Sequence, residues 1–272
     1  MGIRTDGAAA LRIAGGLGAW SGALALSLSG FTLTTRLAPY SPVSTQVAYC
    51  TGFGLVVLSV LAVAIGAPQE RRVCAGLAVS ALLGLIVVQR VGPDAAGGLW
   101  VFCALLAFGS ALGAWVGSAI ERPGHLLFVA LVSSLVDSFS VAHPDGPSAQ
   151  LARQPEMLAL LALPWPMLGT RVAVPLLGVG DVVFTSLYWS AARKHGLAWR
   201  RTLLALAGGY LVTLIAVLVA ARPIPVLPML GAGMLLAHSA ARKPHARDLK
   251  QGLWLVTALA VALGVWVLRR AQ

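Results

Sequence analysis

The chain has 272 residues, of which 58% are hydrophobic and only 11% are charged. Soluble domains contain about 25% charged residues, so this composition excludes an ordinary soluble protein and indicates one that crosses a lipid bilayer several times. The net charge is +11, but the 20 Lys and Arg are scattered over short connections and form no basic arm. We therefore expect no nucleic acid partner and read the charges as determinants of membrane orientation.

A hydropathy window of about 19 residues predicts about nine membrane-spanning helices. The approximate ranges are 9–34, 47–66, 73–91, 98–120, 124–142, 172–192, 202–221, 224–240 and 252–269. The expected fold class is therefore all-α, a polytopic transmembrane helical bundle. We divide it into an N-terminal part, residues 1–123 with about four spans, and a C-terminal part, residues 124–272.

The first span resembles a signal peptide loosely but has no convincing cleavage site, so we expect it to be retained. With the N-terminus in the cytoplasm, most Lys and Arg fall on the inner side, which favours this orientation. The connection 143–171 would then lie outside. It contains a proline-broken apolar piece, 158–168, that is too short to span and that we expect to be re-entrant or to cover the mouth of a cavity.

The fourth predicted span carries a repeated small-residue face. Gly109, Gly113 and Gly117 recur at every fourth position, and such faces let helix backbones approach closely. We expect this face to pack within the same chain rather than to form a dimer. The oligomeric state stays open.

Two of the nine acidic residues, Asp137 and Asp181, lie within apolar runs. An ionised carboxylate in hydrocarbon is costly, so such residues indicate function. Counted along continuous helices at 1.5 Å per residue, they are roughly 8 Å and 14 Å from the outer ends, so the two could face each other. Facing carboxyls share a proton, which supplies a general base for water and a general acid for the leaving group.

Two further elements accompany the acids. Gly178 and Gly180 precede Asp181 without side chains, so a partner helix or a substrate backbone can come close. Pro225, Val226, Leu227 and Pro228 interrupt the eighth predicted span. Proline frees backbone groups that could hold an extended substrate, although a simple helix start or kink explains the same pattern.

These elements together resemble the presenilin and signal peptide peptidase family of intramembrane aspartyl proteases. Gly178-Val179-Gly180-Asp181 looks like the GxGD signature, Asp137 like the first catalytic aspartate, and Pro225-Val226-Leu227-Pro228 like the substrate-binding PAL motif. The resemblance covers about 124–240. It implies a presenilin-like C-terminal half, with Asp137 and Asp181 catalytic and Gly178, Gly180 and the proline motif contacting substrate.

The resemblance also implies partners and a location. Substrates would be transmembrane proteins or signal peptides in the inner membrane of a prokaryote, cleaved without a metal or other cofactor. Two positions depart from the family pattern: Val136 stands where tyrosine is usual, and Val226 where PAL has alanine. The direction predicted for the two aspartate helices matches signal peptide peptidases rather than presenilins.

Other functions fit less well. Prepilin peptidases also carry GxGD but have a lysine soon after the aspartate and a cysteine-rich loop. No GxSG element for a rhomboid-type serine protease is present, and no HExxH zinc motif. A proton-coupled transporter remains an alternative because intramembrane acids and broken helices are also typical of transporters. A catalytically inactive presenilin-like scaffold is the third possibility.

Overall fold

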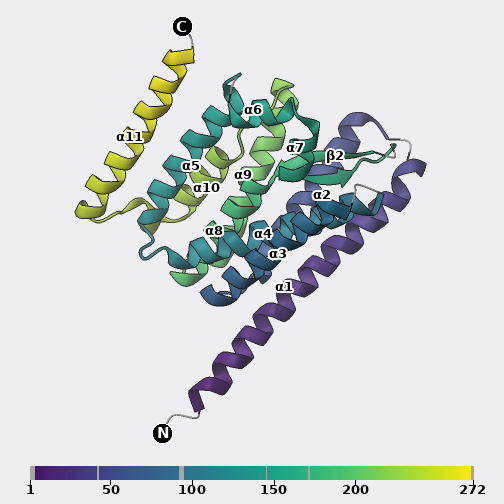
Figure 1. Cartoon of the computed structure of the whole chain (residues 1–272). Helices are drawn as coiled ribbons and strands as arrows, with labels where there is room; N and C mark the ends of the chain where they lie inside the picture. Colours follow the sequence, from purple (N-terminus) through teal and green to yellow (C-terminus); the bar gives the residue numbers. More distant parts are fainter. Residues whose placement is uncertain (1–3, 42, 92–94, 145, 171, 271–272) are drawn as a thin grey trace. The chain divides into compact units, whose positions relative to one another are not determined.

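The computed structural model describes residues 4–41, 43–91, 95–144, 146–170 and 172–270. The described chain is mostly helical and forms two compact units, each built from two separate stretches (Figure 1). Unit 1 contains residues 1–119 and 155–194, and unit 2 contains residues 120–154 and 195–272. The boundary predicted at residue 123 placed 155–194 in the C-terminal part, whereas the structure groups this stretch with the N-terminal helices. Asp181 therefore belongs to unit 1 and Asp137 to unit 2.

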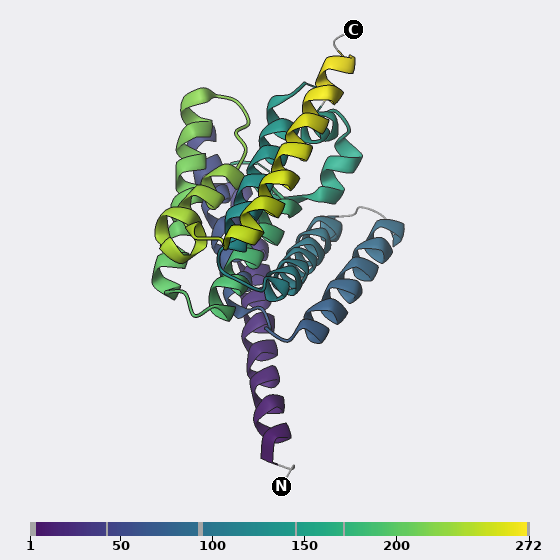
Figure 2. The ribbon, with the colours of Figure 1, turned by 90° about the vertical axis from the view of Figure 1, so that its left-hand side faces the viewer.

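Unit 1 consists of long helices and a small sheet. Its helices are α1 (Arg4–Leu37), the 3-10 turn η1 (Ala38–Tyr40), α2 (Thr45–Gly66), α3 (Arg71–Val91), α4 (Ala95–Ala119), α7 (Pro155–Leu161) and α8 (Val179–Lys194). Helix α4 packs against α8 along one side and α3 along another; Figure 2 shows α3 and α4 side by side. Their long apolar sequences explain the helical state, since a helix satisfies its own backbone groups.

A two-stranded antiparallel sheet is the exception to the all-α expectation. Strands β1 (Ala162–Pro166) and β2 (Ala173–Gly178) pair from Ala162 opposite Gly178 to Pro166 opposite Ala173, with an irregularity after Leu163. The expectation of a continuous helix over 172–192 is therefore wrong for its first third. The apolar piece 158–168, predicted to be re-entrant or to cover a cavity, forms the end of α7 and strand β1.

Aromatic side chains attach the sheet to the helices of unit 1. Trp165 of β1 is only 1% exposed, and its ring lies edge-on to Phe31 of α1 and Phe102 of α4, with centroid distances of 5.5 and 5.3 Å. Gly52 of α2 lets Leu176 and Trp165 approach, because a Cβ there would lie 3.1 and 3.3 Å from them. These contacts fix β2, which leads directly into α8.

The small-residue face of α4 packs within the chain, as predicted. A Cβ on Gly109 would lie 2.8 Å from Cβ of Val182 in α8, and one on Gly113 or Gly117 would collide with the carbonyl oxygen of Val183 or Leu187. Close approach of the two backbones is therefore possible only with glycine at these positions.

Unit 2 contains the other predicted aspartate helix. Its elements are α5 (His125–Ala142), α6 (Pro147–Ala152), α9 (Trp199–Ala220), α10 (Leu227–Ala237), the 3-10 turn η2 (Ser239–Arg242) and α11 (Ala246–Arg270). Helix α10 packs against both α5 and α9, and Leu230 of α10 is fully buried against Gly209 of α9. The buried side chains of Thr202 and His238 are 2.9 Å apart and join α9 to the end of α10.

Helix α11 lies along α5. Near one end Asp248 contacts Arg122 and His125, and Gly252 lies against the ring of Phe128; near the other end Trp266 packs edge-on to Phe139 and His143. The two helices therefore run in the same direction. The rest of α11 is largely exposed, with Trp254 76% exposed.

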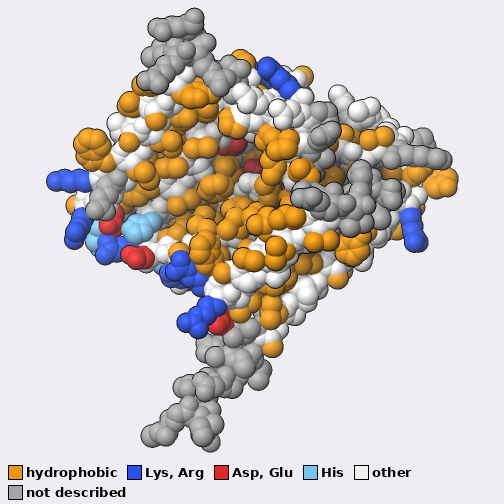
Figure 3. All heavy atoms as spheres, in the orientation of Figure 1, with side chains coloured by type: hydrophobic (Ala, Val, Ile, Leu, Met, Phe, Trp, Pro, Cys, Tyr) orange, Lys and Arg blue, Asp and Glu red, His pale blue; other side chains and the backbone are white. Residues whose placement is uncertain are grey.

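Six described helices are long and apolar enough to cross a membrane: α1, α2, α4, α5, α9 and α11. The remaining three of the nine predicted ranges contain α3, the β2–α8 segment, and the short apolar helix α10. Figure 3 shows hydrophobic side chains over most of the described surface on the face drawn. Such a surface indicates a protein embedded in lipid.

Substitution of Gly113 by alanine tests the contact between α4 and α8. We expect Gly113→Ala to lower the free energy of unfolding by about 1–3 kcal/mol, because its Cβ collides with the carbonyl oxygen of Val183. Thermal unfolding in detergent measures the change. Gly98→Ala, also in α4, is the matched control, since its Cβ meets nothing within 4 Å. Equal effects of the two substitutions would contradict the close packing.

Candidate functional site

Asp137 lies on α5, half-buried, and one oxygen of its carboxylate reaches the proline motif. The backbone N–H of Leu227 donates a hydrogen bond to Oδ2 of Asp137, with a length of 2.9 Å. The first residue of α10 is Leu227, and its preceding cap residue, Val226, makes no side-chain cap. The carboxylate of α5 therefore serves as the acceptor for the start of α10, which explains how two predicted site elements separated by 90 residues come together.

The proline motif begins a helix rather than interrupting one. Pro228 occupies the first turn of α10, where its missing N–H removes no hydrogen bond, and the N–H groups of Met229 and Leu230 both bind the carbonyl of Val226. The preceding residues 221–226 form no helix or strand, and Ala221 ends α9 with a left-handed φ of 49°. Of the alternatives for this motif, the helix start is thus the one observed.

Asp181 lies in the first turn of α8, also half-buried. The N–H of Gly178 donates to Oδ2 of Asp181 over 3.1 Å. Because α8 begins at Val179, Asp181 is its third residue and reaches back to the residue before the helix, as the second half of a capping box does. The depth of roughly 14 Å, which assumed continuous helix at 1.5 Å per residue, is wrong because residues 173–178 are extended.

The glycines of the motif have different surroundings. Gly178 ends β2, and a Cβ placed there would lie 3.4 Å from the carboxylate of Asp181. Gly180 is exposed, and a Cβ there would meet nothing within 4 Å. A Cβ at Gly178 would therefore be in ordinary van der Waals contact with Asp181, and Gly180 has open space beside it within unit 1.

The structure brings the predicted site residues together in two local groups. Asp137 contacts the proline motif in unit 2, and Gly178 contacts Asp181 in unit 1. No cluster of three or more potential metal ligands occurs among the described residues. Two described pockets, of about 500 and 200 Å³, are lined by other residues and do not include either aspartate.

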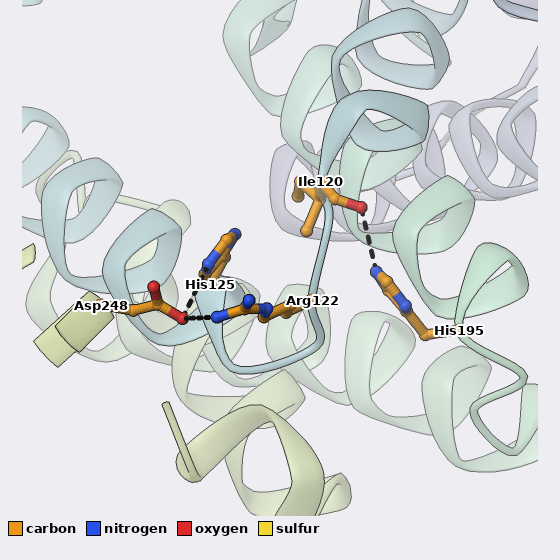
Figure 4. Close-up of polar contacts among 5 residues, drawn as sticks. All are labelled: Ile120, Arg122, His125, His195 and Asp248. Atoms are coloured by element: carbon orange, nitrogen blue, oxygen red, sulfur yellow. Dashed lines mark hydrogen bonds and ion pairs between the residues drawn. The ribbon is translucent and has the colours of Figure 1, made fainter. Parts of the chain in front are cut away.

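Sequence reasoning missed a third polar group, which Figure 4 shows at the start of α5 and α11. Oδ2 of Asp248 accepts from Arg122 at 2.8 Å and lies 3.3 Å from Nε2 of His125. The predicted range of the last span, 252–269, leaves Asp248 outside, whereas the structure places it in the first turn of α11, one of the six candidate spans. The sequence holds no signal for this contact, because Arg122 and Asp248 are 126 residues apart.

Comparisons with protein-family models, with curated proteins and with solved structures found no match to this chain.

Replacement of Asp137 tests its role at the start of α10. We expect Asp137→Ala to lower the free energy of unfolding by about 1–3 kcal/mol relative to Asp137→Asn, because alanine leaves the N–H of Leu227 without its acceptor while asparagine retains one. Thermal unfolding of both variants in detergent checks this. We also expect faster amide hydrogen exchange at Leu227 in the alanine variant but not in the asparagine variant. Equal stability of the two variants would contradict the role of Asp137 at the start of α10.

Proposed function

We propose that this protein is an intramembrane aspartyl endopeptidase of the presenilin and signal peptide peptidase type. The observation that carries the proposal is the hydrogen bond from Leu227 to Asp137. It joins a carboxylate on a candidate membrane span to a proline motif that the resemblance assigns to substrate binding. An acid held against irregular backbone at membrane depth is typical of a functional site.

The mechanism we propose uses Asp137 and Asp181 as a dyad with one shared proton. The ionised carboxylate removes a proton from a water molecule, which attacks the scissile carbonyl, while the protonated carboxyl hydrogen-bonds to that carbonyl oxygen. Collapse of the tetrahedral intermediate then transfers a proton to the leaving amine. The net reaction is hydrolysis of one peptide bond, and neither a metal ion nor a cofactor takes part.

The surroundings of each aspartate support this role. The carboxylate of Asp181 lies at the N-terminus of α8, and that of Asp137 accepts a hydrogen bond at the N-terminus of α10. The N-termini of helices favour negative charge. Strand β2 ends at Gly178 and, in the described sheet, pairs only with β1. We propose that a substrate helix unwinds and lies extended beside β2, with Gly180 leaving room for its backbone. Gly178, Pro225, Val226, Leu227 and Pro228 complete the substrate contacts.

The proposed substrates are transmembrane proteins or signal peptides. The proposed location is the inner membrane of a prokaryote, with a multi-pass topology and a cytoplasmic N-terminus. The six apolar helices support membrane insertion, and the excess of Lys and Arg on the predicted inner side supports the orientation.

Loss of either carboxyl should abolish cleavage of a transmembrane reporter by the purified full-length protein in detergent. Asp137→Asn and Asp181→Asn are the decisive variants, because each keeps an acceptor for its backbone N–H but removes the acid, and we expect product below one-hundredth of the wild-type amount. Glu121→Ala, which removes an exposed carboxyl outside the helices, is the control and should retain activity. Cleavage that persists in either asparagine variant, or a wild-type protein without activity, would overturn the proposal.

Thiol cross-linking tests the dyad independently of activity. In a chain whose Cys50, Cys74 and Cys103 are replaced by alanine, cysteines at 137 and 181 should form a disulfide or react with a short bifunctional reagent, because dyad side chains must meet. Cysteines at 138 and 181 are the matched control, since residue 138 points about 100° away around α5. Absence of the first cross-link, or equal reaction of both pairs, would contradict the arrangement.

A further inference from the structure

A small pocket with basic side chains lies at the start of α5 and α11 in unit 2, and its lining includes neither aspartate. Its volume is about 200 Å³, below the range of about 300–1,000 Å³ that accommodates drug-sized ligands. Its lining comprises Arg122, Pro123, Gly124, Lys243, Pro244, His245 and Asp248. The size suits a compact charged group rather than a whole metabolite.

The shape of the pocket is fixed by close backbone contact. A Cβ on Gly124 would lie 2.7 Å from Cα of Pro244 and 2.9 Å from the carbonyl oxygen of Lys243. The segment after η2 therefore lies directly on the turn before α5, and glycine is required there. The two walls of the pocket, which come from distant parts of the sequence, are held together by this contact.

The charge of the pocket favours an anion. Its one acid, Asp248, is already bound to Arg122 and His125 (Figure 4). Lys243 and His245 are exposed and make no ion pair or side-chain hydrogen bond with other described residues. Arg242, Arg247 and Lys250 add further positive charge within the same nine-residue stretch. An incoming anion would thus meet donors that are not already engaged.

The position of the pocket relative to the apolar helices favours a lipid as the source of the anion. Both α5 and α11 begin at this pocket and are candidate membrane spans, so the pocket lies where their apolar segments end. Beyond Asp248, α11 presents exposed Leu253, Trp254 and Leu255, which are 49%, 76% and 60% exposed. A ligand with a phosphate at the pocket and hydrocarbon along α11 matches both features.

We propose that this pocket binds the phosphate of an anionic phospholipid, with Lys243 and His245 contacting the headgroup and an acyl chain lying along the exposed side of α11. The site is independent of the proposed protease activity, and it rests on membrane insertion of α5 and α11. The chemistry it recognises is a phosphodiester at the bilayer surface. Basic pockets between helices at the cytoplasmic side are suited to such headgroups.

Lipid retention by the full-length protein tests the proposal. The protein is reconstituted in nanodiscs with equal phosphatidylglycerol and phosphatidylcholine, extracted in mild detergent, and its bound lipid is counted by native mass spectrometry. We expect phosphatidylglycerol to be retained preferentially, and Lys243→Gln to reduce its affinity roughly fivefold, the loss that corresponds to about 1 kcal/mol per basic residue near a membrane surface. Lys250→Gln is the matched control, since this lysine is exposed in the same stretch but does not line the pocket.

Each contrary result overturns a defined part of the proposal. Equal losses of phosphatidylglycerol affinity in Lys243→Gln and Lys250→Gln would show that the lipid is attracted to the basic surface in general and does not bind in the pocket. Retention of both lipids in equal amounts by the wild type would remove the anion preference. Displacement of phosphatidylglycerol by soluble glycerol 3-phosphate at comparable concentration would identify a free phosphate, not a lipid, as the ligand.

Discussion

Backbone N–H groups in apolar surroundings require partners, and this requirement explains the position of both aspartates. The N–H of Leu227 at the start of α10 binds Asp137, and that of Gly178 at the start of α8 binds Asp181. Neither helix has a serine, threonine or asparagine at the residue before its first turn, so a carboxylate supplies the acceptor. In each case the acid of the proposed dyad also stabilises the helix start beside it.

The hydrogen bond to the helix start limits the conformations that each aspartate side chain can adopt. A carboxylate that accepts a backbone hydrogen bond has fewer rotamers than an exposed one, so its second oxygen has a defined direction. Such positioning favours catalysis, because a reacting group must already be oriented when substrate arrives.

The sequence predicted those features that depend on local pattern. Apolar length identifies α2, α4, α5 and α9, and the spacing of Gly109, Gly113 and Gly117 predicts close helix packing within the chain. The prediction of helix from hydropathy was wrong at residues 173–178, because hydropathy alone does not distinguish a short apolar helix from a strand. Pairing of this segment with Ala162–Pro166 makes it a strand. The sequence placed Asp137 and Leu227 in one site but did not predict the hydrogen bond between them, and it did not predict the contact of Arg122 with Asp248. Both contacts depend on tertiary packing, since their partners are 90 and 126 residues apart.

The glycine contacts between α4 and α8 have a mechanical consequence. Carbonyl oxygens of Val183 and Leu187 fit into spaces left by Gly113 and Gly117, so sliding or rotation of α8 along α4 would drive backbone into backbone. We therefore expect α4 and α8 to move together as one rigid pair of helices. Any displacement of Asp181 within unit 1 should therefore carry α4 together with α8.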